Sequence, residues 1–320
     1  MTRSGPVSDR DMMRLVAELY YVRELRQPVI AELTGFSISK VSRLLSQARD
    51  VGVVRIWVEP ASEERSALEA ELGNRFGIEV LITPGREPDP AAAARLSGVA
   101  AVDAVVRALP ESGTVGVAAG YTVGAMASAL PQLSRPGLTI MPVVGGVDAQ
   151  LEFLDGNQLT RRIAERLGAT PLFLHAPAVL DTPEMKDALL RDSAIAATTA
   201  RWGSLDMAVV GIGGGPTAHP GYRTVVDRMG DPVRRELASM DVVGDLAGHF
   251  FGQDGTFVEE PWGQRIVAIP IEDLRRVPKV VAIAAGAPKA VAILGALRTR
   301  VIHVLITDRP TGEAVLKLAG

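Results

Sequence analysis

Apolar and polar positions near the start of the chain follow the helical repeat in three successive stretches. Residues 8–26 carry apolar side chains at helical spacing, namely Met12, Leu15, Val16, Leu19 and Tyr20. Residues 28–33 predict a second, short helix that stops before Gly35. Ser37 is a favourable N-cap for a third helix over residues 38–50. The pattern therefore predicts three short helices joined by tight turns.

The second and third of these helices have the spacing of a helix-turn-helix. Ala31 is small where two helices would cross closely, and Gly35 follows four residues later in the turn. Val41 and Leu44 then face the first two helices. We expect the same apolar core to contain Ile30, Ile38 and Leu45. In this motif the second helix of the pair enters the major groove of DNA.

The positions left outside that core are short, polar or basic. We expect these side chains to reach base edges and phosphates: Ser37, Ser39, Lys40, Ser42, Arg43 and Gln47. Residues 53–60 alternate as a strand and predict a wing, with Arg55 on the flanking phosphates. The alternative is a plain helical cap with the same spacing. Agreement of the spacing, the turn glycine, the polar face and the wing favours a DNA reader.

Charge and composition support this interpretation only locally. The chain carries a net charge of -3, yet residues 37–58 hold four basic residues against one acidic residue. Such a balance suits phosphate contact, although ordinary surfaces also have it. No run approaches the roughly 20 apolar residues of a membrane helix, and the first residues lack a signal core. With no cysteines, we expect a cytoplasmic protein with no membrane partner.

Beyond Pro60 the pattern becomes an alternation of strands and helices. Such alternation predicts an α/β fold with a mostly parallel sheet covered on both faces. The strand-sized runs are residues 78–82, 114–118, 138–144, 170–175, 206–213, 265–270, 279–285 and 301–307. The helices include residues 91–109, 157–167, 288–297 and 312–318. A helix within residues 60–77 precedes the first of these strands and is expected to link two domains.

Ligands in such folds lie at the carboxyl ends of the strands, where this chain has glycine-rich loops. After one strand, Gly116 and Gly120 permit close approach, and a helix begins near Thr122. The N–H groups of that helix start and the threonine hydroxyl suit a phosphate. The glycine spacing matches neither a dinucleotide-binding fingerprint nor a P-loop. The alternative is a tight strand–helix turn without a ligand.

Other strand ends add polar candidates. Gly145 and Gly146 end one apolar run and Gly213 ends another, while Asp245 follows a strand where its carboxylate can accept sugar hydroxyls. Lys289 is expected in the first turn of a helix, and the positive end of a helix disfavours a cation unless an anion lies between them. The alternative for Lys289 is a solvated surface lysine.

No catalytic set emerges from the sequence. The four histidines do not have the spacing of metal ligands, and no nucleophile-elbow motif is present. We therefore predict no catalytic residue, no metal site and no cofactor apart from a small-molecule effector.

The motifs, taken in order, resemble the SorC family of bacterial sugar-binding transcriptional regulators. The resemblance spans almost the whole chain and rests on "FSISKVSRLLSQARDVGVVRIWV", "TVGVAAGYTV", "PVVGGV", "DMAVVGIG", "GDLAGHFFGQDG" and "AAGAPKAVAILGAL". It implies a winged-helix-like reader joined to an effector domain similar to ribose-5-phosphate isomerase and glucosamine-6-phosphate deaminase. It also implies a phosphorylated sugar as effector and a homo-oligomer, commonly a tetramer, on palindromic operator DNA.

Carried over by motif, the resemblance also implies an effector site. The phosphate cradle would be Gly120, Tyr121, Thr122 and Val123, with Lys289 opposite. The remaining lining would be Gly145, Gly146, Asn157, Gly213 and Asp245. Tyr121 stands where the family commonly has an arginine, so the effector is either a sugar phosphate or a sugar held by other hydrogen bonds.

We therefore expect a DNA-binding domain over residues 1–59, a linker helix over residues 60–77 and an effector-binding and oligomerisation domain over residues 78–320. The leading hypothesis is a regulator whose operator binding responds to a sugar or sugar phosphate. One rival is a sugar-phosphate isomerase or deaminase with an appended DNA-binding segment, in which Asp245 would be the base. Another is an architectural DNA-binding protein whose large domain only oligomerises.

Overall fold

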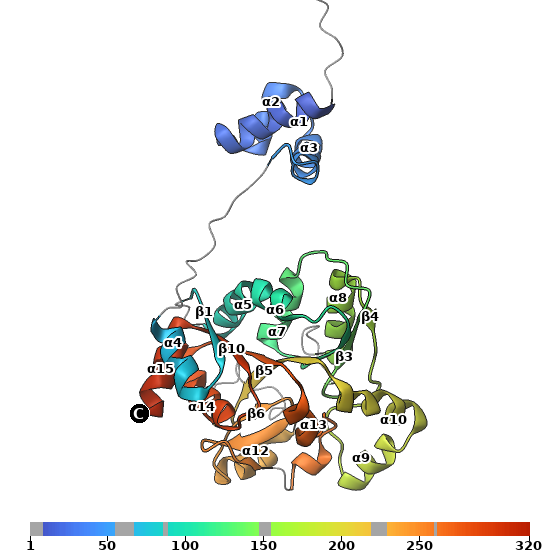
Figure 1. Cartoon of the computed structure of the whole chain (residues 1–320), viewed down its shortest axis with the longest axis vertical. Helices are drawn as coiled ribbons and strands as arrows, with labels where there is room; N and C mark the ends of the chain where they lie inside the picture. Colours follow the sequence, from blue (N-terminus) through green and yellow to red (C-terminus); the bar gives the residue numbers. More distant parts are fainter. Residues whose placement is uncertain (1–8, 55–66, 86–88, 147–154, 219–228, 259–260) are drawn as a thin grey trace, which may run out of the picture. The chain divides into compact units, whose positions relative to one another are not determined.

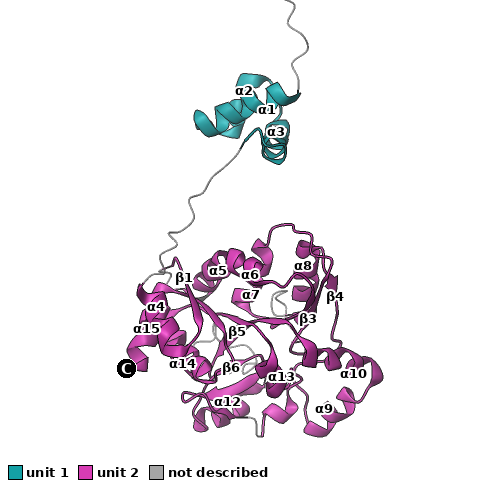
Figure 2. Ribbon diagram, in the orientation of Figure 1, with its two compact units in different colours: residues 1–64 teal, residues 65–320 magenta. Residues whose placement is uncertain are grey.

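The chain folds into two compact units, residues 1–64 and residues 65–320 (Figure 1, Figure 2). The computed structural model describes residues 9–54, 67–85, 89–146, 155–218, 229–258 and 261–320. The first two residues of the expected wing strand, Val53 and Val54, form a bend, and the rest of it, with Arg55, lies outside the described residues.

Short helices make up the smaller unit. They are α1 (Asp9–Ala17), a π-helical turn η1 (Glu18–Val22), α2 (Gln27–Thr34) and α3 (Ile38–Asp50). Gly35, with φ of 70°, ends α2 in the left-handed region, where glycine is unstrained. Ser37 begins α3 by accepting a hydrogen bond of 3.2 Å from the backbone N–H of Lys40. The predicted turn glycine and N-cap are therefore confirmed.

A parallel sheet forms the centre of the larger unit. Its parallel strands are β1 (Glu79–Thr83), β2 (Gly113–Val117), β3 (Leu138–Pro142), β4 (Thr170–Pro171), β5 (Met207–Gly214), β9 (Val280–Ile283) and β10 (Val304–Asp308). Across the sheet they follow the order β1-β10-β9-β5-β2-β3-β4. The predicted α/β fold with a mostly parallel sheet is therefore confirmed.

Apolar cores on both faces of the sheet hold it in place. Along β5, Met207 and Val209 belong to one core, and Ala208 and Val210 belong to the other. The first core includes side chains of α6 (Val102–Ala108), α7 (Tyr121–Ala129) and α8 (Gly156–Leu167). The second includes side chains of α4 (Ala67–Phe76), α13 (Ile271–Arg276), α14 (Ala290–Arg298) and α15 (Arg309–Ala319). Within the described part of the chain, no helix has the length and apolar character needed to cross a membrane.

The carboxyl end of β5 leaves the parallel pattern. Its last residues pair antiparallel with β6 (Val242–Leu246), which continues into β7 (His249–Gly252) and β8 (Phe257–Val258). In this pairing Gly213 lies directly opposite Asp245. Two residues that are far apart in the sequence thus become neighbours at one edge of the central sheet.

The remaining helical segments connect these elements. They are α5 (Pro90–Ala100), α9 (Pro183–Leu190), α10 (Ser193–Thr199), η3 (Ala200–Ser204), α12 (Gly230–Ser239), η5 (Gly263–Arg265) and η6 (Ala287–Lys289). The helix expected over residues 91–109 is thus divided into α5 and α6 at Ala101. The described part of the expected linker helix is α4, which buries Leu68 and Leu72 in the core of the larger unit.

Two of the expected strands are much shorter than predicted. Only Thr170 and Pro171 of residues 170–175 form a strand, and residues 265–270 make isolated bridges instead. In these bridges Ala268 pairs with Val144, and Ile266 pairs with Val179. Leu174 of the first run and Ile266, Val267 and Ile269 of the second are nevertheless buried, because side-chain burial depends on the surrounding layers and not on a continuous strand ladder.

Helix α5 packs very closely against α7 at Gly98. A Cβ atom at this position would lie 2.7 Å from the Cβ of Ala125 and 3.0 Å from the backbone N of Met126, and would also collide with the carbonyl oxygen of Thr122. Two of these neighbours are backbone atoms, which cannot rotate away. The crossing of α5 and α7 therefore requires glycine at position 98.

The substitution Gly98→Ala should push α5 away from α7. We expect a loss of about 1–3 kcal/mol of unfolding free energy, as for other overpacked cores. Urea unfolding of the full chain measures it. Gly203→Ala is the matched control, because an added Cβ there meets only Asp273 Oδ1 at 3.9 Å. Equal stability of the two variants would show that the α5–α7 crossing is not as tight as described.

Candidate functional site

Helix α3 has one buried stripe and one exposed face. Its inward side chains are Val41, Leu44, Leu45 and Ala48, which pack with Val16 and Ile30 of the other two helices. The opposite face carries Ser39, Ser42 and Arg43, all exposed. The first turn begins at Ser37, whose Oγ lies 3.0 Å from the Oγ of Ser39. An exposed helix start of this kind offers hydroxyls, a cation and backbone N–H groups to an anionic partner.

The described DNA-binding candidates lie on or beside this face. Ser37, Ser39, Ser42, Arg43 and Gln47 are exposed. Lys40 is half-buried, and its ammonium lies 4.0 Å from the centroid of the Phe36 ring. This cation–π contact directs Lys40 along the flank of α3. Arg55 lies outside the described residues.

The structure corrects the expected position of Ile38. This residue was predicted to lie in the core with Ile30 and Leu45, but its side chain is 52% exposed. Ile38 is the first residue of α3 and lies at the margin of the inward stripe, where few side chains cover it. Helical spacing alone does not separate the edge of an apolar stripe from its centre.

In the larger unit, the strand order reverses between β2 and β5. From β2 the chain proceeds outward to β3 and β4, whereas β5, β9 and β10 lie on the other side. Because these strands are parallel, their carboxyl ends share one edge of the sheet. A crevice at such a reversal is where open α/β folds bind ligands. The loops after β2, β5 and β9 lie at the carboxyl ends of strands at or next to this reversal, so they are the candidates for lining a ligand site.

The loop after β2 ends in the first turn of α7. Gly120 is its N-cap, and a Cβ there would have no atom within 4 Å, so the backbone faces open space. The N–H of Gly124 donates to the carbonyl of Gly120 at 2.8 Å, and the preceding N–H groups of the helix have no intrahelical acceptor. Val123 is fully buried, so only its backbone can reach a ligand. Thr122 is also buried, and its hydroxyl donates to the carbonyl of Ile283 at 2.7 Å.

Several other candidates have clear packing roles. A Cβ at Gly116 would collide with Val143, and one at Gly145 would collide with the backbone of Pro177. Gly146 exchanges backbone hydrogen bonds with Ala176 and Ala178.

The side chain of Asn157 is similarly engaged. Its amide nitrogen donates to the carbonyl of Leu174 at 2.9 Å, and its oxygen accepts from the Leu174 N–H at 3.0 Å. Both polar atoms of Asn157 thus bond backbone groups of the following loop. These contacts tie the first turn of α8 to the segment that follows β4, and a ligand role for the Asn157 side chain would require breaking them.

Gly213 and Asp245 form a matched pair across β5 and β6. A Cβ at Gly213 would overlap the carboxylate of Asp245, so glycine leaves the space that this side chain occupies. Asp245 is only 4% exposed, and its Oδ1 has no hydrogen-bond partner in the described structure. A buried carboxylate oxygen without a donor is costly, and a ligand hydroxyl can satisfy it.

Lys289 is the cation that faces this carboxylate. It ends η6 and immediately precedes α14. Burial raises the pKa of Asp245 to about 6, although the charge of Lys289 and the N–H of Gly248 oppose the rise. Burial lowers the pKa of Lys289 to about 8, although the charge of Asp245 opposes the fall. The two groups therefore depend on each other for their charged forms.

Asp308 supports the Lys289 turn and was not among the predicted residues. Its Oδ2 accepts from the N–H of Gly286 at 2.9 Å, and its Oδ1 caps α15 through the N–H of Thr311 at 2.8 Å. The sequence signal that could have identified Asp308 is an aspartate that follows an apolar run and precedes a helix with proline in its first turn. Asp308 fixes the start of the turn that carries Lys289.

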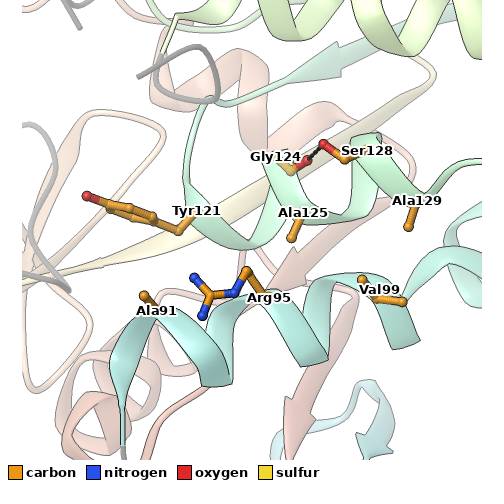
Figure 3. A pocket seen from close by; sticks show the side chains of 8 residues that line it. All are labelled: Ala91, Arg95, Val99, Tyr121, Gly124, Ala125, Ser128 and Ala129. Atoms are coloured by element: carbon orange, nitrogen blue, oxygen red, sulfur yellow. Dashed lines mark hydrogen bonds between the residues drawn. The ribbon is translucent and has the colours of Figure 1, made fainter. Parts of the chain in front are cut away.

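A groove of about 580 Å³ lies between α5 and α7 (Figure 3). It is lined by Arg95 and Val99 of α5 and by Tyr121 and Ala125 of α7. In Figure 3, Arg95 extends from α5 toward α7, and the ring of Tyr121 projects from the first turn of α7. Arg95 was not predicted; a lone arginine in an alanine-rich helix was the only sequence feature that marked it. Tyr121 belongs both to this groove and to the loop after β2.

Comparisons with known proteins agree with this architecture. The model of the family described as "Putative sugar-binding domain" matches residues 61–317. The sorbitol operon regulator of Klebsiella pneumoniae is 30% identical over 97% of this chain and 100% of its own length. The deoxyribonucleoside regulator of Bacillus subtilis is 25% identical over 96% of this chain and 99% of its own.

Solved structures extend the match to three dimensions. The crystal structure of full-length SorC from Klebsiella pneumoniae gives a TM-score of 0.73 at 29% identity, covering 96% of this chain and 99% of that one. The sugar-binding domain of a transcriptional repressor from Vibrio fischeri gives 0.70 at 27% identity, covering 80% of this chain and 99% of that one. These matches define the class as transcriptional regulators with a sugar-binding domain. Within that class, the chain belongs to the SorC family.

Replacing Asp245 should change the titration of Lys289. In Asp245→Asn the negative charge that raises the lysine pKa is lost, so we expect a Lys289 pKa below about 8. Carbon-13 dimethylation of the lysines followed by NMR titration measures it, with Lys289→Ala to assign the resonance. Exposed Lys317 provides an internal control. An unchanged Lys289 titration would show that the two groups do not interact.

Proposed function

We propose that this chain is a DNA-binding transcriptional regulator whose operator binding is controlled by a sugar or sugar phosphate bound in the larger unit. The observation that carries the proposal is the exposed polar and basic face of α3. The proposal is supported by sequence and structural similarity, over almost the whole chain, to named regulators that include the sorbitol operon regulator.

We infer that α2, the turn at Gly35 and α3 form a helix-turn-helix, with a wing over residues 53–60. The left-handed turn and the Ser37 cap support the motif, because they set the angle at which α3 leaves α2. On this proposal Ser39, Ser42 and Arg43 face the major groove, while Lys40 and Gln47 lie toward phosphates. Arg55 belongs to the proposed wing.

We infer that the larger unit has the fold of the sugar-phosphate isomerases and deaminases and holds the effector at the β2–β5 crevice. The N–H groups at the start of α7 point away from the helix and suit a phosphate, and Lys289 supplies a nearby cation. The unpartnered oxygen of Asp245 suits a sugar hydroxyl. Gly116, Gly145, Gly146 and Asn157 then support the loops around the effector.

Control of DNA binding requires two arrangements of the protein with different affinities for the effector. We propose a homo-oligomer, a tetramer by resemblance to the family, because a palindromic operator presents two half-sites to two reading helices. The protein would act in the cytoplasm without a metal or a bound cofactor.

One observation favours the alternative that the protein is an enzyme. Asp245 is a buried carboxylate with a raised pKa, and it lies beside Lys289, whose pKa is lowered. Such pairs are typical of acid–base catalytic sites. On that alternative Asp245 is a base for a sugar-phosphate isomerase or deaminase. Proton NMR of candidate sugar phosphates incubated with the protein separates the two. Turnover abolished by Asp245→Asn supports the enzyme, and stable substrates that change DNA affinity support the regulator.

Arg43→Ala should weaken specific DNA binding by about ten- to a hundredfold, the cost expected for losing a bidentate contact to guanine. Arg43→Lys keeps the charge but not the planar fork, so discrimination between bases should fall with little change in salt dependence. Both are measured by titration on a duplex selected from a random library by the full-length protein. Because Arg43 is exposed, both variants should unfold like the wild type. Unchanged affinity in Arg43→Ala would remove this residue from the interface.

Effector affinity should depend on the ionisation of Lys289. A phosphate favours the charged lysine, so the affinity for a sugar phosphate should fall as the pH rises through about 8. Thermal-shift titration against sugars and their phosphates at pH 7 and pH 9.5 measures this. Lys289→Ala should abolish the pH dependence and the effect on DNA binding, whereas Lys317→Ala should keep both. An intact response in Lys289→Ala would exclude this lysine from the site.

A further inference from the structure

Ile38 is one of several exposed apolar side chains in the described part of the smaller unit, with Leu15, Val22, Val29, Leu33 and Val51. Ile38 is 52% exposed and is the first residue of α3, directly after the Ser37 cap. Scattered exposed apolar residues are common on proteins, so exposure by itself carries little weight. Its surroundings are more informative, because the exposed residues of α3 are otherwise polar or charged: Ser39, Ser42, Arg43, Gln47, Arg49 and Asp50.

The helical repeat places Ile38 beside the central reading positions. With 3.6 residues per turn, Ser42 lies one turn beyond Ile38 on the same flank, and Ser39 and Arg43 lie next to them on the outer face. Lys40 lies on the opposite flank, where its ammonium contacts the Phe36 ring. The first turn therefore has an apolar flank at Ile38 and a cationic flank at Lys40.

The two flanks suit different parts of a DNA groove. The N-terminal residues of a reading helix contact base edges, and a cation beside it suits the phosphate backbone. Among the four bases, only thymine presents a methyl group in the major groove. A β-branched side chain such as isoleucine has few χ1 rotamers to lose when it packs against that methyl.

We propose that Ile38 is a specificity-determining residue that reads thymine through its 5-methyl group in each half-site. The inference rests on the proposed function, since it requires α3 to lie in the major groove. It adds a thymine preference that the polar residues of α3 do not supply, because serine hydroxyls bond several bases and arginine prefers guanine.

The test removes one methyl group per half-site from the DNA and three side-chain carbon atoms from residue 38 of the protein. A duplex is selected from a random library by the full-length protein, and each thymine pair related by the half-site symmetry is replaced by deoxyuridine. For the wild type, one such pair should weaken binding by about fourfold per half-site, the equivalent of one buried methyl group. Ile38→Ala should bind the thymine duplex more weakly, but should not distinguish thymine from uracil at that position.

Val51→Ala is the matched control. Val51 is also an exposed apolar residue, at 58%, but it follows the last turn of α3. This variant should keep the full thymine–uracil difference. Urea unfolding of both variants checks that the smaller unit remains folded.

The outcomes separate the inference from the proposed function. Failure to enrich any duplex would overturn both. Specific binding in which no deoxyuridine pair weakens the wild type would overturn only the role of Ile38. The same would follow if Ile38→Ala lost equal affinity for thymine and uracil duplexes, because the side chain would then act by packing within the protein.

Discussion

Burial of the central sheet on both faces is the constraint on which the larger unit depends. Met207 and Val209 of β5 pack into one core while Ala208 and Val210 pack into the other, so both sides must be covered by helices. Helices in the connections between the strands supply that cover, and such connections join parallel strands. Their carboxyl ends consequently meet at one edge, and the reversal between β2 and β5 brings together loops that are distant in the sequence.

At that edge the larger unit holds a buried carboxylate, Asp245, near the charge of Lys289. Asp245 fills the space left by Gly213, and one of its oxygens has no donor among the described residues. Lys289 offsets part of the cost of burying this carboxylate, and Asp308 holds the turn on which it lies. On the proposed function, an effector hydroxyl that donates to Asp245 would relieve this cost, and it would bind better to the arrangement of the protein that presents this oxygen.

The smaller unit forms its core from few residues and leaves most of α3 exposed. A short inward stripe on α3 packs against α1 and α2, and the capped turn between α2 and α3 sets the direction of the helix. Because so little of α3 is needed for the core, most of its surface is available to a partner. The Lys40–Phe36 contact and the exposed Ile38 then give the two flanks of the first turn different chemistry.

Local patterns in the sequence determined the helices of the smaller unit, the glycine turn, the Ser37 cap and most strands of the parallel sheet. These features depend on contacts within a few residues, or on the alternation of apolar positions, and both can be read along the chain. Only the tertiary structure revealed that Gly116 and Gly145 accommodate neighbouring segments and that Asn157 bonds the Leu174 backbone. It alone also decided the exposure of Ile38, the pairing of Asp245 with Lys289 and the bridging role of Asp308. Each of these depends on which distant segments become neighbours, and residue type and spacing do not specify that.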